Sequence, residues 1–527
     1  MSMVINTNTA SMVAQAAQAK TSSAMDTAME RLSTGKRINT AADDAAGLSI
    51  ASRMDSQIKG LSMAMRNAAD AQSLIDTTEG AHDEITNILQ RMRELSIQSI
   101  NDTNSSSDRV SLQAEVTQLQ SEIDRIANQT TWNNLSIMNG NFASKSFQVG
   151  AEKDQTISVS VDSVAAASIG SHQVNGNMGL ASGTSNGMDA DGDVTITGTL
   201  GSSTIDVSAT DKSAKSFAAA VNNVSSSTGV TATAVTKVKL SNMSAADTVS
   251  FSVNGTSIGA VAIASASDLT DLKDAINAVA GTTGVTASLS GGSKAALELV
   301  DIDGDDISIS SYATTSTALL RLTVLDKDGN AASATGGTEL SAEFADLAAH
   351  ADGTTYGNAV AFTVTGQVSL NSDKAFTLAT VHDANEFDTD TPADDALESI
   401  TADGEFFGTA GTAGTVITNS SLSNVGSINI STASGATSAI DIIDGALERI
   451  NNARADLGAI SNRLDHTISN LSSVKVNTEA SQSRIQDADF AAETSNLTKA
   501  QILSQAATAM LAQANASKQS VLSLLQG

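Results

Sequence analysis

The chain lacks cysteine altogether and has a single proline, Pro392, among its 527 residues. The absence of cysteine excludes disulfides, thiolate metal sites and cysteine nucleophiles. Aromatic residues are scarce as well, at 3% of the chain with one Trp and two Tyr. Because enzyme pockets and high-affinity grooves commonly depend on aromatic side chains, this scarcity argues against both kinds of site.

Basic side chains are also few, with 29 Lys and Arg against 58 Asp and Glu, for a net charge of −29. Binding to duplex nucleic acid needs a basic surface that neutralises phosphates, so we expect no nucleic-acid partner. No stretch reaches the roughly 18 consecutive apolar residues of a membrane-spanning helix. Residues 1–19 lack the apolar core of a general secretory signal. We therefore expect no membrane insertion, and any export to use another route.

The net charge is distributed unevenly along the chain. Residues 1–178 and 436–527 carry net charges of −6 and −2, whereas residues 179–435 carry −21. The chain is also longer than the roughly 250–300 residues at which single domains stop growing. The distribution predicts more than one domain, with the acidic middle region facing solvent.

Both end regions show apolar residues at spacings of three and four, the pattern of helices with one apolar face. These stretches cover residues 58–95, 112–126 and 443–474, the last with one gap at Arg454. A single thin helix cannot bury such a face alone. Three matching stretches from opposite ends of the chain therefore predict one coiled helical rod, with the middle region inserted between its helices.

The middle region changes to strand-like alternation from about residue 140. Within it, residues 220–232 resemble residues 275–287 at an offset of 55 positions. Each copy follows a strand-like run, which indicates a repeated unit of strands, a short helix and a strand. The predicted fold class is mainly α at the ends, as a long coiled-coil rod made from both termini, with an inserted β-rich or α+β central region.

The outermost segments, residues 1–40 and 487–527, are rich in Ala, Ser, Gln and Asn, with apolar residues at heptad-like positions. Isolated helices are marginal in water, and alanine faces bury little apolar area. We expect these segments to be disordered in the monomer and to become helical when they pack against copies of themselves.

A search for catalytic and metal motifs gives no convincing match. Residues 183–187 fit a nucleophile-elbow pattern, but they lie in a Gly/Ser/Asn-rich connector rather than between a strand and a helix. Acidic Asp-Gly turns at residues 189–193, 301–305 and 326–330 could chelate Ca²⁺, yet they lack the glycine and glutamate positions of an EF-hand loop. Asp-Gly is also a favoured hairpin turn. We predict no catalytic residue, no metal and no cofactor, so the chain is not expected to be an enzyme.

Several segments of the two end regions closely resemble bacterial flagellin. They lie in order within residues 1–175 and 436–527, about half of the chain, and comprise residues 31–39, 42–50, 90–95, 113–116, 121–125, 147–151, 483–489 and 520–525. The repeat at residues 194–297 resembles a module found inserted in flagellin and hook proteins.

The resemblance implies a secreted structural subunit that self-assembles into the helical extracellular filament of the bacterial flagellum for swimming. It implies inner-core terminal helices for polymerisation at residues 1–42 and 487–527, and an outer-core rod with a β-hairpin at residues 43–178 and 436–486. Residues 179–435 would be a surface-exposed insertion of two or more small α+β modules. The alternative is a hook–filament junction protein, which shares the end motifs.

The resemblance also implies partners and contact residues. The partners are copies of the chain, a flagellar export chaperone at the C-terminal helix, the type III export route, and the filament cap and hook-associated proteins. A flagellin-sensing Toll-like receptor of the host would bind at Arg91, Leu95 and Glu115. Taken without the resemblance, Arg91 fits either a solvated helix face in contact with Glu94 or Leu95, or an exposed patch for a partner.

The C-terminal tail supplies a second set of residues by resemblance. Inner-core assembly and sensing inside host cells map to Val521, Leu522, Leu524 and Leu525. The tail departs from the family at Gln526, where related chains often carry Arg, which weakens the expectation of cytosolic sensing.

Overall fold

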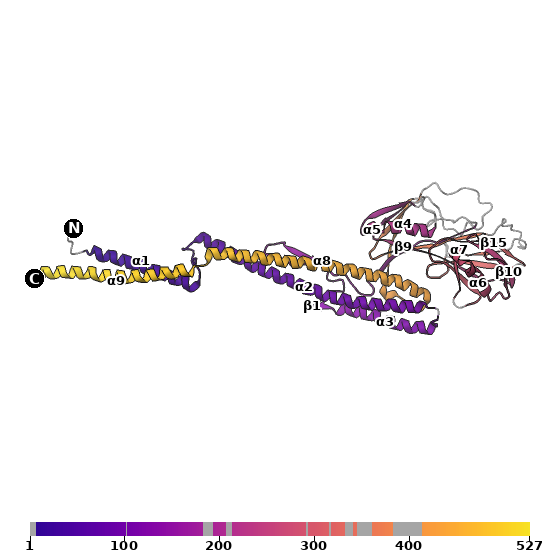
Figure 1. Ribbon diagram of the computed structural model, residues 1–527, viewed down its shortest axis with the longest axis horizontal. Coiled ribbons are helices and arrows are strands. Elements are labelled where there is room, and N and C mark those ends of the chain that lie inside the picture. The colour runs from indigo at the N-terminus through magenta and orange to yellow at the C-terminus, as the bar shows by residue number, and fades with distance from the viewer. Residues whose placement is uncertain are drawn as a thin grey trace. The chain divides into compact units, whose positions relative to one another are not determined.

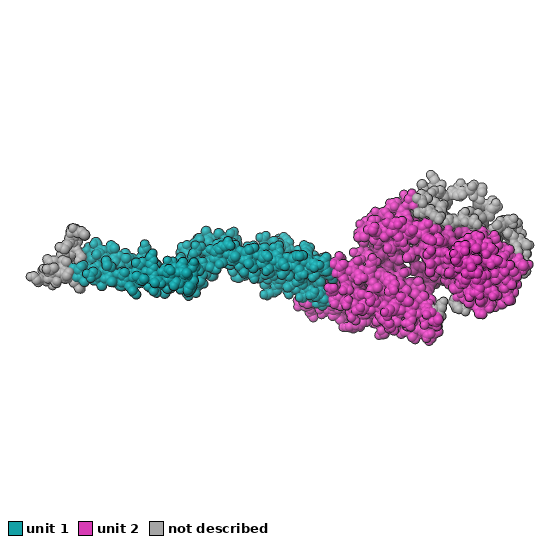
Figure 2. Space-filling model, viewed as in Figure 1, with its two compact units in different colours: residues 1–77, 144–160, 457–527 teal, residues 78–143, 161–456 magenta. Residues whose placement is uncertain are grey.

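The computed structural model describes residues 7–101, 103–182, 193–206, 213–290, 293–315, 318–332, 341–344, 361–382 and 414–526. The chain divides into two compact units, which Figure 2 draws in different colours. Unit 1 consists of residues 1–77, 144–160 and 457–527, and unit 2 of residues 78–143 and 161–456. Segments from distant parts of the sequence therefore meet in each unit.

Five long helices come from the two ends of the chain (Figure 1). They are α1 (Thr9–Thr34), α2 (Ala45–Ile100), α3 (Ser106–Gln129), α8 (Ala433–Gln486) and α9 (Phe490–Gln526). The 56 residues of α2 span about 84 Å without a proline. The predicted fold class is confirmed, because long helices lie at both ends of the sequence and the region between them is rich in strands.

The apolar faces predicted from the sequence form the interior of the helical rod. In unit 2, α2 contributes Ile85, Leu89 and Met92, and α3 contributes Ile123, all of them fully buried. A capping box begins α3, since the side chains of Ser105 and Asp108 each accept a hydrogen bond from the other's backbone N–H.

The apolar face of α8 behaves differently along its length. Ile443, Ile450 and Leu464 are buried, whereas Val474 is exposed. Because α3 belongs to unit 2, the part of α8 in unit 1 has one fewer helix to cover it. The sequence pattern predicts the helix correctly, but burial of its face stops before the predicted end.

A β-hairpin completes unit 1, as the alternation near residue 147 predicts. Strands β3 (Lys145–Gln148) and β4 (Thr156–Val159) pair in antiparallel register. Asn67 of α2 donates a side-chain hydrogen bond to the Gln148 carbonyl at 2.9 Å, which ties the hairpin to the helix. A short hairpin in unit 2 follows α3 and consists of two strands of two residues each, β1 (Thr131–Trp132) and β2 (Leu135–Ser136).

Three larger antiparallel sheets build the middle region in unit 2. The first has the order β11-β10-β15-β18-β6 with β12 beside β10, the second β13-β14-β9-β19-β5-β22 with β16 and β17 beside β9, and the third β21-β20-β7-β8. The first contains β6 (Gly179–Ser182), β10 (Asp247–Val253), β11 (Thr256–Ser257), β12 (Val261–Ile263), β15 (Ile307–Thr314) and β18 (Phe362–Thr365). The second contains β5 (Gly170–Asn175), β9 (Thr231–Ser241), β13 (Thr286–Leu289), β14 (Ala296–Asp301), β16 (Leu320–Leu325), β17 (Ser341–Phe344), β19 (Gln367–Ser372) and β22 (Ser421–Asn424). The third contains β7 (Asp193–Thr197), β8 (Ser202–Asp206), β20 (Thr377–His382) and β21 (Gly414–Asn419).

The internal repeat is confirmed at the level of single hydrogen bonds. Helices α4 (Ala214–Asn223) and α5 (Ser225–Thr228) of the first copy correspond to α6 (Thr270–Ala278) and α7 (Ala280–Thr283) of the second. Asn222 pairs its side-chain amide with both backbone groups of Ala232, at 2.8 Å each. Asn277 makes the same two bonds to Ala287, also at 2.8 Å. The repeated Asn therefore fastens each helix pair to the strand that follows.

The two copies of the repeat share a strand, so they are not structurally independent modules. At one end of β9, Ala232 lies in a core with Phe217 of α4. Further along the same strand, Val238 and Leu240 lie in a second core with Leu272 of α6. Each helix packs on its own core, while one strand runs through both.

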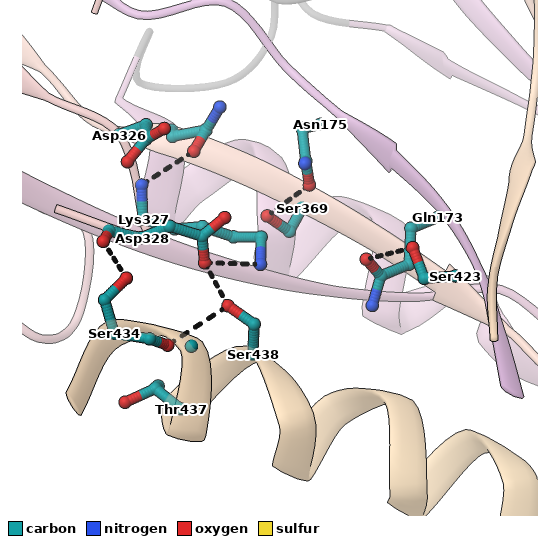
Figure 3. Close-up of polar contacts among 12 residues, drawn as sticks. Gln173, Asn175, Asp326, Lys327, Asp328, Ser369, Ser423, Ser434, Thr437 and Ser438 are labelled. Atoms are coloured by element: carbon teal, nitrogen blue, oxygen red, sulfur yellow. Dashed lines mark hydrogen bonds and ion pairs between the residues drawn. The ribbon is translucent and has the colours of Figure 1, made fainter. Parts of the chain in front are cut away.

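Two of the three acidic Asp-Gly segments, residues 301–305 and 326–330, lie in the described part of the chain and form turns. Asp301 is buried and accepts hydrogen bonds from the N–H groups of Asp303 and Asp305, at 3.1 and 3.4 Å. Burial raises the pKa of Asp301. The turn at residues 326–330 contacts the start of α8, where Asp328 accepts hydrogen bonds from the hydroxyls of Ser434 and Ser438 (Figure 3). Residues 183–187 and 189–193 fall almost wholly outside the described residues, which resume at Asp193.

Candidate assembly and recognition surfaces

The terminal helices α1 and α9 lie side by side in unit 1 and run in opposite directions (Figure 1). The 26 residues of α1 bury only Ala28. In α9, up to the last described side chain, Glu493 and Ala500 are buried. Large apolar side chains remain in water instead, including Val13 at 69% and Met510 at 66% exposure. Such a helix pair leaves an open apolar surface.

A shallow groove of about 620 Å³ lies between the two helices. Its walls carry small side chains, such as Ala14 and Ala17 of α1 and Ala507 of α9, together with Leu503 and Met510. Alanine faces allow close approach but bury little area, at about 25 cal/mol per Å². The groove therefore contributes weakly to holding the pair together.

The net charge of the chain comes entirely from unit 2. Unit 1 contains fourteen Lys and Arg and fourteen Asp and Glu, for a net charge of zero. Unit 2 contains 15 basic and 44 acidic side chains, for a net charge of −29. Copies of unit 1 can therefore approach one another without net repulsion, whereas copies of unit 2 repel.

The candidate receptor residues lie together on the unit 2 part of the rod, but they are not equivalent. Arg91 of α2 forms ion pairs with Glu94 and with Glu115 of α3, both at 2.9 Å. Hydrogen bonds to Glu94 and Glu115 raise the pKa of Arg91. Leu95 is only 1% exposed. The accessible part of this patch is thus the Arg91–Glu115 pair, whereas Leu95, four residues after Arg91 on α2, is buried.

The C-terminal candidates Val521, Leu522, Leu524 and Leu525 lie in the last turns of α9. Their side chains are outside the part of the chain whose side chains the structure describes.

A buried histidine lies where α2 and α8 meet in unit 2. His82 is 1% exposed, and its Nδ1 atom has no hydrogen-bond partner among the described residues. Burial, with a smaller contribution from the nearby Arg454, lowers the pKa of His82 from 6.5 to about 4. Arg454 itself pairs with Glu79 and Asp83 of α2 at 3.5 Å each. These ion pairs explain the gap at Arg454 in the apolar pattern of α8, which sequence analysis left without a role.

No arrangement for metal or membrane binding accompanies these surfaces in the described ranges. No group of three or more His, Asp or Glu side chains is placed there to hold a metal ion. Among the helices that the structure describes, none has a stretch long and apolar enough to span a membrane.

Comparison with known proteins accounts for these features together. The family models for the bacterial flagellin N-terminal and C-terminal helical regions match residues 5–143 and 440–525. The B-type flagellin of Pseudomonas aeruginosa is 37% identical over 530 residues, and the alignment covers all of both chains. The chain belongs to the bacterial flagellin family.

The chain is also similar to other known proteins. The flagellin of Salmonella choleraesuis is 33% identical over 542 residues, again with both chains fully covered. The solved structure of FliC from Burkholderia pseudomallei aligns with 75% of this chain and 99% of its own, at 21% identity and a TM-score of 0.27. The flagellin hook IN motif matches residues 248–303, which confirms the predicted resemblance for the second copy of the repeat.

Membership of the family establishes the function at the level of the filament. The chain is a structural subunit that self-assembles into the bacterial flagellar filament, an extracellular structure that serves motility. Full-length relatives named flagellin favour the filament subunit over a hook–filament junction protein. Association with hook-associated proteins fits the family as well.

The buried His82 makes the stability of the flagellin rod depend on pH. Its lowered pKa means that the unfolded chain takes up a proton near pH 6.5, whereas the folded chain does so only near pH 4. The contribution is full above pH 6.5, and about 3 kcal/mol is lost as the pH falls to about 4. We expect His82→Leu to remove this loss in calorimetric unfolding of the rod at pH 7 and pH 4.

The matched control is His466→Leu, since His466 is exposed on α8. It should keep the wild-type loss of stability. An equal loss of stability in wild type and His82→Leu would show that the buried imidazole does not control the acid response.

Proposed function

We propose that residues 1–42 and 487–527 act as the polymerisation domain of this flagellin. The supporting observation is the open apolar surface of α1 and α9, in which few of the described side chains are fully buried. Apolar surface exposed on this scale favours association, and unit 1 carries no net charge to oppose it. Neighbouring copies would cover this surface through repeated contacts that do not close into a ring, which is how a helical polymer grows.

The remaining segments take the outer positions in this proposal. Residues 43–178 and 436–486 form the outer-core rod, and residues 179–435 form the solvent-facing insertion. The insertion holds most of the acidic excess. Mutual repulsion of this charge would limit side-to-side association of filaments at low salt. At 0.1 M salt the repulsion would act only over the screening length of roughly 10 Å.

Before assembly, the same apolar surface needs protection. We infer that an export chaperone covers α9, since Ile502, Leu503 and Met510 are all exposed on it. By family resemblance, the chain would then be exported through the flagellar type III route. The filament cap would be a partner during assembly.

Deletion of residues 487–527 tests the polymerisation domain. Because the buried contacts of the rod and the modules lie elsewhere, the truncated chain should stay folded and soluble but form no filaments. Circular dichroism reports the fold, and electron microscopy after addition of filament seeds reports assembly. The full-length chain is the control, and filaments from the truncation at normal yield would contradict the proposal.

We further propose that the monomer binds the flagellin-sensing Toll-like receptor through Arg91 and Glu115, together with Leu95, which is buried on the same helix as Arg91. Support comes from the exposure of the Arg91–Glu115 pair on two adjoining helices. The four tail residues Val521, Leu522, Leu524 and Leu525 are proposed to serve inner-core assembly and sensing inside host cells.

Arg91→Ala should reduce receptor activation at least about tenfold, because arginines that anchor an interface are often worth more than 1.4 kcal/mol. The measurement is a dose–response in reporter cells treated with monomeric protein. Arg125→Ala is a matched control, since Arg125 on α3 is similarly exposed at 52% and pairs with Glu122. An equal response of the two variants would argue against the patch.

A further inference from the structure

The register of α1 on α9, meaning the position of each helix along the other, requires specific contacts between the two helices. The groove between α1 and α9 is lined mainly by alanine and threonine, and such small side chains give similar contacts in several registers. Its larger members do not remove the ambiguity. Leu503 and Met510 are seven residues apart, so a slip of two helical turns brings one to the place of the other.

A specific set of contacts lies instead at the base of the helix pair, where α1 ends and α9 begins. Arg31 Nη1 of α1 contacts Glu493 Oε1 of α9 at 3.1 Å, across 462 residues of sequence. The Glu493 side chain is 10% exposed and that of Arg31 28%. Glu493 also accepts a hydrogen bond from Asn496 through its second oxygen at 3.2 Å. Among the ion pairs of the described residues in unit 1, this one is therefore the most buried.

Backbone hydrogen bonds flank this ion pair. The N–H of Ala488 donates to the Gly35 carbonyl at 2.9 Å, and the N–H of Arg37 donates to the Gln486 carbonyl. Gly35 ends α1 in the left-handed conformation, with φ of 69°. These bonds join the segments that connect α1 to α2 and α8 to α9, at a single antiparallel register.

The residues that line the groove fit the same register as the contacts at the base of the helix pair. In an antiparallel pair the two residue numbers at each level have a constant sum, and Arg31 and Glu493 give 524. Ala17 with Ala507 and Ala14 with Met510 give the same sum, and all four residues line the groove. We infer that the Arg31–Glu493 pair sets the register of α1 on α9, which the flanking backbone bonds do not hold by themselves, and thereby positions the apolar surface used in assembly.

This inference rests on the proposed polymerisation role for its consequence, but its test does not require filaments. Since the chain has no cysteine, pairs of cysteines report the register directly. Three double variants place one cysteine at Ala17 and the other at Ala507, Ala500 or Ala514. The last two are shifted by seven residues, or about 10.5 Å along the helix. That shift exceeds the Cα–Cα distance of up to about 7 Å that a disulfide allows.

In the wild-type background we expect intrachain oxidation of the Ala17/Ala507 pair to exceed that of either shifted pair at least about tenfold. Glu493→Ala should reduce this preference to less than about twofold. Relative yields on non-reducing gels suffice, so the helices need to meet only transiently. Charge reversal at Arg31 is avoided, because Asp43 lies 3.8 Å away and would repel the new carboxylate.

Asp55→Ala is the matched control, since it breaks an exposed ion pair with Lys59 in the same unit, with side chains 48% and 74% exposed. It should leave the preference intact. An unchanged preference in Glu493→Ala would overturn the inference while leaving the proposed polymerisation role standing. Failure of the wild-type chain to form seeded filaments would instead count against that role.

Discussion

The weakness of the contact between α1 and α9 is the constraint on which the rest of the molecule depends. Two helices of 26 and 37 residues meet through alanine-rich faces and leave residues such as Val13 and Met510 in water. Helices gain most of their stability from tertiary burial rather than from intrinsic propensity. In the proposed polymerisation role, neighbouring copies supply the surface that these helices need, so that order in the terminal helices and growth of the filament would be one process.

The distribution of charge and burial supports this division of roles. Unit 1 combines zero net charge with exposed apolar side chains, whereas unit 2 combines a charge of −29 with the large buried cores of the sheets. Under the proposed function, association is a role of unit 1, while the larger buried cores that stabilise the single chain lie in unit 2. The strand β9, which the two repeated modules share, gives the middle region cohesion, since neither module can unfold without exposing part of the other's core.

Sequence patterns predicted those features that depend on local periodicity. The apolar faces of α2 and α3, the insertion and the 55-residue repeat follow from spacing alone, and the structure explains the repeat through Asn222 and Asn277. Features that depend on which segments meet were not predictable in this way. The pairing of Arg31 with Glu493 arises from a contact between distant elements, whereas the burial of Leu95 follows from the apolar pattern that ends at this residue. The sequence distinguishes such an arginine from any other charged helix residue only after the partner helix is known.

Hydrogen exchange on the monomer and on the assembled filament tests the central claim most directly. The account predicts rapid exchange at residues 9–28 of α1 and 497–514 of α9 in the monomer, and strong protection of the same amides in the filament. Amides of α2 and α3 near Leu89 and Ile123, which are fully buried, should be protected in both states. Strong protection of the terminal helices in the monomer, equal to that in the filament, would contradict the claim that neighbouring copies supply their stability.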